Sequence, residues 1–187
     1  MQQHLTVIDL EAGLSELGAS PQDHGKLEMI VCRPERNERK LLEHAQLDQI
    51  EGLVGDNWRA RGSSRTEDGS AHPGMQLTLM NSRVIRLLAQ ERSRWSLAGD
   101  QLYVDLDLSV ANLRPGQQLA VGSAVLEITD VAHTGCDKFT ERYGHEAIRF
   151  VNSKEGRSER RRGIYARVIQ SGSIAVGDTI SKLDSPL

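Results

Sequence analysis

The second half of the chain most strongly constrains the fold, because after Gly99-Asp100 it becomes a series of short apolar runs separated by turn residues. Clusters such as Arg114-Pro115-Gly116 and Gly122-Ser123 lie between these runs, and glycine, proline and serine favour turns. Short strands at this spacing are typical of a β-barrel or a β-sandwich. The runs span residues 102–106, 118–121, 124–128, 164–169 and 173–180.

Two of these runs predict a specific strand pair. Residues 119–121 and 125–126 flank Gly122-Ser123, an arrangement that favours an antiparallel hairpin with a tight turn. We therefore predict a mostly β fold of the α+β class, in which the helices lie at the periphery.

The first half of the chain contributes helices and further strands. Leu10, Leu14 and Leu17 recur at helical spacing, which predicts a short amphipathic helix over residues 5–17. Thr6 can cap the amino end of this helix. The other predicted elements are strands at residues 27–32, 38–47 and 76–80, and a helix at residues 81–91 that is capped by Asn81.

The length of 187 residues is enough to bury a core without disulfides, and it fits one domain with a small appendage. We assign residues 1–25 to an amino-terminal helix and loop that pack on the domain, and residues 26–187 to the domain itself. The 23 basic and 26 acidic residues leave a net charge of −3. Such a chain has no overall field that would attract DNA or an anionic membrane, so we expect neither nucleic acid nor membrane as a partner.

The chain contains two cysteines, Cys32 and Cys136, and neither belongs to a CxxC pair of the kind that binds zinc or forms a dithiol centre. Cys32 ends a predicted strand, so we expect it to be a small buried core residue. The first residues, Met1-Gln2-Gln3-His4, lack the basic region and apolar run of a secretion signal, and no stretch reaches the length of a membrane span. These features predict a protein of the reducing cytoplasm.

Reactive side chains are concentrated in the segment His133-Thr134-Gly135-Cys136-Asp137-Lys138-Phe139. A thiol acts as a nucleophile or metal ligand in its thiolate form, which a neighbouring Lys138 or a protonated His133 would favour. Two short helices are predicted to follow, at residues 137–143 and 145–151. Cys136 would then stand at the amino end of a helix, where the helix dipole also favours the thiolate.

Two basic segments have two interpretations each. Residues 59–73 are polar, arginine-rich and without periodicity, which is typical either of a functional loop or of a solvated surface excursion. The run at residues 157–162 contains four arginines, but Glu155 and Glu159 dilute its charge. We expect a solvated face there, with an anion site as the alternative.

Several of these features occur together in an order that resembles the MOSC domain, the module named for the carboxy-terminal domain of molybdenum cofactor sulfurase. They cover about three quarters of the chain. The matching pieces are Gly52-Leu53-Val54-Gly55-Asp56, Gly99-Asp100-Gln101-Leu102, the turns around Pro115-Gly116 and Gly122, Cys136, residues 162–168, and residues 172–178.

The resemblance implies a MOSC-type β-barrel with peripheral helices and one cysteine in a functional cleft. In related proteins that cysteine binds the molybdenum of a molybdopterin cofactor, in reductases of N-hydroxylated compounds, or is proposed to carry sulfur. Carried over to this chain, the resemblance makes Cys136 the metal ligand and catalytic thiol, and His133 or His72 the group that handles protons. The implied cofactor-binding residues are Asp56, Arg61, His72, Lys138 and Arg149, with the arginines suited to the phosphate of the pterin.

The chain departs from the family pattern in two places. Many members carry a histidine shortly after the Gly-Asp pair, whereas Asn57-Trp58-Arg59 follows Asp56 here. In many members the cysteine follows proline, whereas Gly135 precedes it here. Larger relatives also contain a pyridoxal-phosphate domain, and we expect none in this chain.

Three functions are compatible with the sequence. The first is a small molybdenum-cofactor enzyme that binds this small-molecule cofactor through Cys136 and works with a redox partner. The second is a sulfur carrier, in which Cys136 receives a persulfide sulfur from a cysteine desulfurase partner, since a carrier needs no second thiol. The third is a non-catalytic binding domain, because a shared fold does not by itself confer an activity.

Overall fold

The computed structural model describes residues 4–183, and it contains a closed barrel of seven strands. Around the barrel the strands follow the order β11-β7-β8-β9-β5-β6-β1, and β1 closes the ring by pairing with β11. The mostly β, α+β barrel fold is therefore confirmed. The barrel strands are β1 (Gly25–Cys32), β5 (Leu77–Asn81), β6 (Leu102–Asp105), β7 (Gln118–Val121), β8 (Ala124–Ile128), β9 (Ile164–Gln170) and β11 (Thr179–Leu183).

One strand pair in the barrel is parallel. β5 and β6 run side by side, with Leu79 opposite Leu102, and the chain between them forms α4 (Ser82–Ala89) and the 3-10 helix η2 (Arg92–Ala98). The other pairs are antiparallel, including the predicted hairpin of β7 and β8, in which Val121 faces Ala124. A parallel pair needs such a crossover, and this crossover places the end of η2 next to the start of β6.

Two predicted strands are each divided into two. The stretch at 38–47 forms β2 (Lys40–Leu42), which pairs with β1, and β3 (His44–Asp48), which pairs with β10 (Gly172–Ala175) and β4 (Gly52–Leu53) in a separate small sheet. The stretch at 173–180 likewise divides into β10 and β11 around Gly177-Asp178. In each case the two halves belong to different sheets. The local sequence pattern does not show to which sheet a strand belongs.

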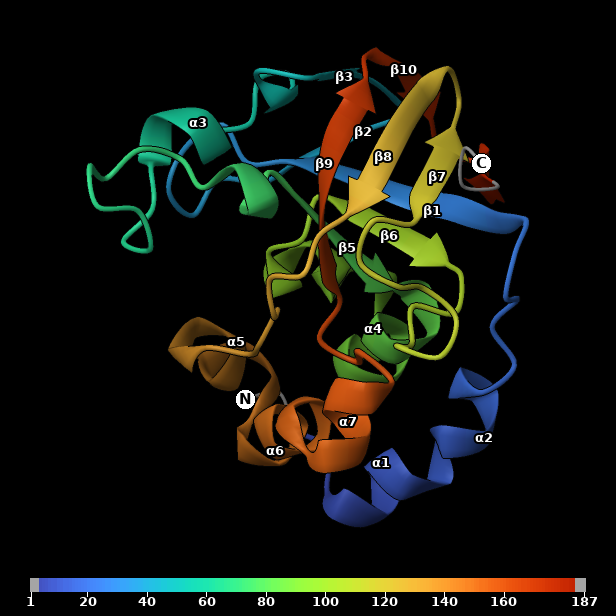
Figure 1. The fold of residues 1–187 in the computed structure, drawn as a ribbon. Helices are drawn as coiled ribbons and strands as arrows, with labels where there is room; N and C mark the ends of the chain where they lie inside the picture. Colours follow the sequence, from blue (N-terminus) through green and yellow to red (C-terminus); the bar gives the residue numbers. More distant parts are fainter. Residues whose placement is uncertain (1–3, 184–187) are drawn as a thin grey trace.

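The helices gather mainly at one end of the barrel, as Figure 1 shows for α1, α2, α4, α6 and α7. The predicted helix at 5–17 is interrupted at Gly13, where a Cβ atom would lie 2.6 Å from Leu87. Thr6 caps it as predicted, in a capping box with Asp9. The helical elements not yet given are α1 (Val7–Ala12), α2 (Leu14–Leu17), α3 (Trp58–Arg61), η1 (Pro73–Met75), α5 (Asp137–Tyr143), α6 (His145–Asn152) and α7 (Lys154–Ser158).

Alternation along the strands divides the core into two parts. Leu79 and Leu102 point into the barrel, whereas their neighbours Met80 and Tyr103 point outward into a second apolar cluster beneath the helices. Leu10 of α1 belongs to this second cluster, so the amino-terminal helices pack on the same body as the barrel. The outermost parts of the two predicted domain ranges, residues 1–3 and 184–187, lie outside the described residues.

Candidate functional site

Cys136 occupies the N-cap position of α5, as predicted, and its side chain is exposed. The Cys136 carbonyl accepts hydrogen bonds from the amides of Phe139 at 2.9 Å and Thr140 at 3.1 Å, which begins the helix. Phe139 is buried in the second apolar cluster and anchors this first turn. The other cysteine, Cys32, is buried, and burial raises the pKa of its thiol. Cys136 is thus the accessible thiol of the two.

The Cys136 side chain lines a cavity of about 490 Å³, which we call the Cys136 cavity. Segments that are far apart in sequence meet there: the chain after β1, the α3 region, the end of η2, and α5. Glu35 is the one acidic residue among the described residues of its wall. The cationic residues of the wall are Arg33, Arg36, Arg39, Arg61, Lys138, Arg142 and Arg162.

Four of these arginines are held by one short piece of backbone, the carboxyl end of η2. The last carbonyls of a helix have no partner within the helix and carry the negative end of its dipole, so they attract cationic donors. Four successive carbonyls accept hydrogen bonds from these arginines, which come from three parts of the chain, since Arg33 and Arg39 both follow β1. Arg39 donates to Ser96 O at 3.2 Å, Arg142 to Leu97 O, Arg162 to Ala98 O at 3.0 Å, and Arg33 to Gly99 O at 2.7 Å.

Two of the four arginines also have a buried carboxylate partner. Arg33 binds both oxygens of Asp56, each at 2.8 Å, and Arg162 binds both oxygens of Asp100, at 2.7 and 3.0 Å. Both carboxylate side chains are 0% exposed. Burial raises the pKa of the Asp100 carboxyl, and Arg162 opposes that rise. These two ion pairs fix their arginines in position and cancel their charge.

The remaining cations of the wall have no such compensation. Within residues 4–183, no carboxylate lies within ion-pairing distance of Arg36, Arg39, Arg61, Lys138 or Arg142. Burial lowers the pKa of Arg39 and of Arg61, and neighbouring arginines lower both further. Like charges that crowd in this way indicate a site for a bound anion.

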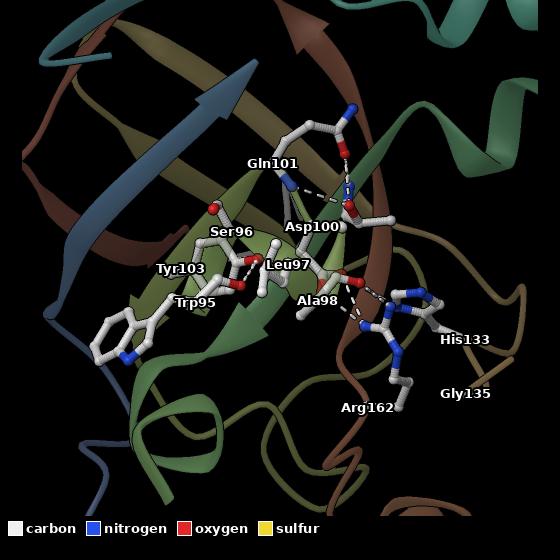
Figure 2. A network of polar contacts seen from close by, with 12 residues as sticks. Trp95, Ser96, Leu97, Ala98, Asp100, Gln101, Tyr103, His133, Gly135 and Arg162 are labelled. Carbon is white, nitrogen blue, oxygen red and sulfur yellow. Dashed lines mark hydrogen bonds and ion pairs between the residues drawn. The ribbon is translucent and has the colours of Figure 1, made fainter. Parts of the chain in front are cut away.

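His133 lies beside the Asp100–Arg162 pair, as Figure 2 shows. Its side chain is 7% exposed, its ring packs on Tyr165 with centroids 4.4 Å apart, and its Nδ1 lies 3.8 Å from Asp100. Among residues 4–183, neither the buried Nδ1 nor Arg162 Nε has a hydrogen-bond partner. His133 and Arg162 also line a second cavity of about 240 Å³ beside the first. His133 and Arg162 therefore line both cavities, and each offers a polar atom that could bind a ligand.

Burial, followed by the charge of Arg162, lowers the pKa of His133 well below its ordinary value of 6.5, so the folded protein keeps this imidazole neutral. Below pH 6.5 the unfolded chain binds a proton at His133 that the folded chain does not, and the free energy of unfolding falls as the pH is lowered. Between pH 7.5 and 5.5 this histidine should remove about 1.4 kcal/mol of stability. Urea unfolding should show a pH-dependent loss that is smaller by this amount in His133→Gln.

The matched control for this prediction is His44→Gln, because the His44 side chain is exposed and makes no hydrogen bond or ion pair to the described residues. It removes an imidazole that does not contact the Asp100–Arg162 pair. Equal pH dependence in His133→Gln and wild type would show that His133 takes up its proton in the folded state as readily as in the unfolded chain.

The structure brings together four of the seven predicted site residues. Cys136, His133, Arg61 and Lys138 all line the Cys136 cavity. The other three do not line it, and each has another contact: Asp56 binds Arg33, His72 Nδ1 accepts from the Gly74 amide at 3.1 Å, and Arg149 pairs with Glu146.

The sequence did not predict that the arginines at the end of η2 belong to the site. Arg33, Arg36 and Arg39 form a dense group directly after β1, and this density was a usable signal. The expectation of a solvated face at 157–162 is wrong for Arg161 and Arg162, which are buried. Arg161 lies over the Phe150 ring, 4.1 Å from its centroid, and Arg162 pairs with Asp100. Arg161 also pairs with the nearby Glu159, but Asp100 and Phe150 are farther away in the sequence, and the folded chain brings them to the two arginines.

The residues of the Cys136 cavity suit a cofactor that itself supplies most of the ligands of its metal. No cluster of three or more His, Cys, Asp or Glu residues that could hold a metal ion occurs among residues 4–183. Cys136 can supply one soft thiolate, and the arginines can supply donors for a phosphate. The unpartnered Nδ1 of His133 adds a polar atom on the same wall. A molybdopterin cofactor, whose dithiolene and phosphate would meet these groups, fits the residues present.

Solved structures share this fold. The YuaD protein from Bacillus subtilis is 16% identical, with a TM-score of 0.57 over 84% of this chain and 94% of that one. YiiM from Escherichia coli is 15% identical, with a TM-score of 0.55 over 86% and 71%. YiiM from Geobacillus stearothermophilus is 13% identical, with a TM-score of 0.58 over 86% and 75%. At these identities the likeness concerns the fold alone.

A comparison with curated proteins found no match. Among the described residues, no helix has both the length and the apolar character needed to cross a bilayer. The family model for the MOSC domain matches residues 67–181, well over half of the chain, and these residues include Cys136, His133 and the end of η2. The chain belongs to the MOSC domain family.

Proposed function

We propose that this protein binds a molybdenum cofactor, molybdopterin, with Cys136 as the metal ligand, and reduces N-hydroxylated compounds. The observation that carries the proposal is an exposed thiol that opens into a cavity with surplus positive charge. A thiolate is a soft ligand suited to a transition metal, and a pterin phosphate needs cationic donors nearby. A reducing compartment such as the cytoplasm would keep Cys136 as a free thiol.

The predicted site residues that line the cavity each have a role in this proposal. Arg61 and Lys138 bind the phosphate, because they lie in the cavity and no carboxylate in the described part of the chain pairs with them. The bound cofactor supplies the electrons for reduction of the N–O bond. His133 stays neutral, so it orients the cofactor or the substrate as a hydrogen-bonding group, and protons reach the leaving oxygen through the open mouth of the cavity. Arg149 is outside the cavity and has no role in the proposal.

Metal and pterin analysis tests this proposal. The protein is produced in cells that make the cofactor, and wild type is compared with Cys136→Ala and with Cys32→Ala, which removes the buried thiol instead. Wild type and Cys32→Ala should contain molybdenum and fluorescent pterin in near-equal amounts, and Cys136→Ala should lose the metal-bound form and the reductase activity. A wild-type protein free of both molybdenum and pterin would reject the proposal.

The exposure of Cys136 also favours a second candidate function, a persulfide carrier. In that reaction a desulfurase breaks the C–S bond of free cysteine, alanine leaves, and the sulfur atom becomes bonded to Cys136 as a persulfide. The cationic wall would stabilise the persulfide anion. Mass spectrometry after incubation with a desulfurase and cysteine should then show one added sulfur on Cys136 and none on Cys32. An unmodified Cys136 would argue against the carrier.

A further inference from the structure

Some of the arginines in the Cys136 cavity are neutralised by carboxylates and others are not. Arg33 and Arg162 are neutralised by Asp56 and Asp100. Arg39 and Arg142 are bound to the neighbouring carbonyls of Ser96 and Leu97, and neither has a carboxylate partner in the described part of the chain. One wall of the cavity therefore carries two adjacent guanidinium groups whose charges are not cancelled.

The two guanidinium groups are fixed, yet each keeps donors for a ligand. A guanidinium has five N–H donors. Arg39 uses Nε for Ser96 O and Nη1 for Glu38 O, so its Nη2 makes no hydrogen bond to the described protein. Arg142 uses Nη1 for Leu97 O, so its Nε and Nη2 make none. The backbone carbonyls hold both guanidinium groups in place. Their remaining N–H donors can therefore bind the oxygens of a planar anion.

The proposed cofactor does not account for these donors. A pterin phosphate carries at most two negative charges, and Arg61 and Lys138 are available to it without Arg39 and Arg142. Burial and then the charge of Arg142 lower the pKa of Arg39, and an additional anion beside the two arginines would offset both effects. Resting on the proposed function, we propose that Arg39 and Arg142 form a second anion subsite that binds a carboxylate on the substrate. The substrates would then be N-hydroxylated compounds that carry an acidic group.

The test measures the binding of benzoate and of its neutral analogue benzamide to the cofactor-loaded protein by calorimetry at low salt. Wild type should bind benzoate about tenfold or more tightly than benzamide, because charge-assisted hydrogen bonds to a carboxylate are strong. The preference should nearly vanish when Arg39→Gln and Arg142→Gln are combined. Arg167→Gln, which removes an exposed arginine paired with Glu127 outside the cavity, should keep it.

Molybdenum and pterin contents are measured on the same samples, and they separate the two possible sources of the anion. Unchanged contents in the double variant with loss of the benzoate preference support a substrate subsite. Loss of molybdenum and pterin in the double variant would show that the two arginines hold the cofactor, and it would overturn the substrate assignment. Equal binding of benzoate and benzamide to wild type would also overturn it.

Further measurements apply if the double variant is unfolded or if wild type contains no cofactor. If circular dichroism shows that the double variant is unfolded, Arg39→Lys replaces it, since lysine keeps the charge and loses the planar fork. The benzoate preference should then fall at least about threefold, and an unchanged preference would count against the subsite. If wild type contains no cofactor, the proposed function fails by itself, and the benzoate preference of the purified protein still decides whether the subsite exists.

Discussion

Arg162→Met is expected to lower the free energy of unfolding by about 3–5 kcal/mol, the usual cost of leaving one partner of a buried ion pair uncompensated. Arg162 binds both oxygens of Asp100, and the Asp100 side chain is 0% exposed. Methionine keeps much of the apolar stem but offers no donor, so the carboxylate remains buried without its cation. Urea unfolding measured by circular dichroism at pH 7 gives the difference directly.

Two controls show whether the buried charge causes the loss. Arg167→Met removes a cation whose side chain is 51% exposed and pairs with Glu127, and exposed pairs contribute only about 0–1 kcal/mol. The combination of Asp100→Asn with Arg162→Met removes both charges and should recover part of the stability. A loss in Arg162→Met no greater than that in Arg167→Met would mean that water reaches Asp100.

Gly163→Ala is expected to destabilise the protein by about 2–4 kcal/mol through steric strain where β9 begins. Gly163 has φ of +103°, and a Cβ atom there would lie 2.3 Å from the carbonyl oxygen of Leu79 on the neighbouring strand β5. The chain must reach this position to place Arg162 on one side and Ile164 in the barrel. Thermal and urea unfolding of the variant will measure the cost.

Gly116→Ala is the matched control for this second variant. Gly116 also has a positive φ, +84°, but a Cβ atom there has nothing within 4 Å. Its substitution should cost only the conformational strain, about 1–2 kcal/mol. Equal losses in the two variants would show that the close approach of Leu79 is relieved by a small shift of the backbone.

The sequence was informative about local structure around Cys136. Helix α5 begins where Cys136 predicted it, and the hairpin of β7 and β8 has the predicted turn. The predicted strand at 38–47 was wrong as a single element, because β2 and β3 pair in different sheets. Turn residues and caps act within a few positions of the chain, whereas β3 pairs with β10, which lies more than a hundred positions away.

The separation in sequence between interacting residues also decides which parts of the site the sequence could predict. Cys136, His133 and Lys138 are neighbours in sequence, so their proximity followed from the sequence alone. Asp56 and Arg149 were assigned by motif and by residue type, but Asp56 pairs with the distant Arg33 and Arg149 pairs with Glu146 one turn away in α6. Ion pairs such as Arg33–Asp56 join positions 23 residues apart, and no periodic pattern reports them.

By itself, the sequence determined a series of short strands and a single accessible thiol at a helix start, because turn chemistry, strand alternation and capping are local. The pattern fitted a barrel or a sandwich, and the resemblance to the MOSC domain favoured the barrel. Only the tertiary structure decided that four arginines from three segments meet at successive carbonyls of residues 96–99. The crossover between the parallel strands β5 and β6 places the end of η2 beside the cavity, and carbonyls at a helix end attract guanidinium groups. The positive charge beside Cys136 is therefore a product of the fold.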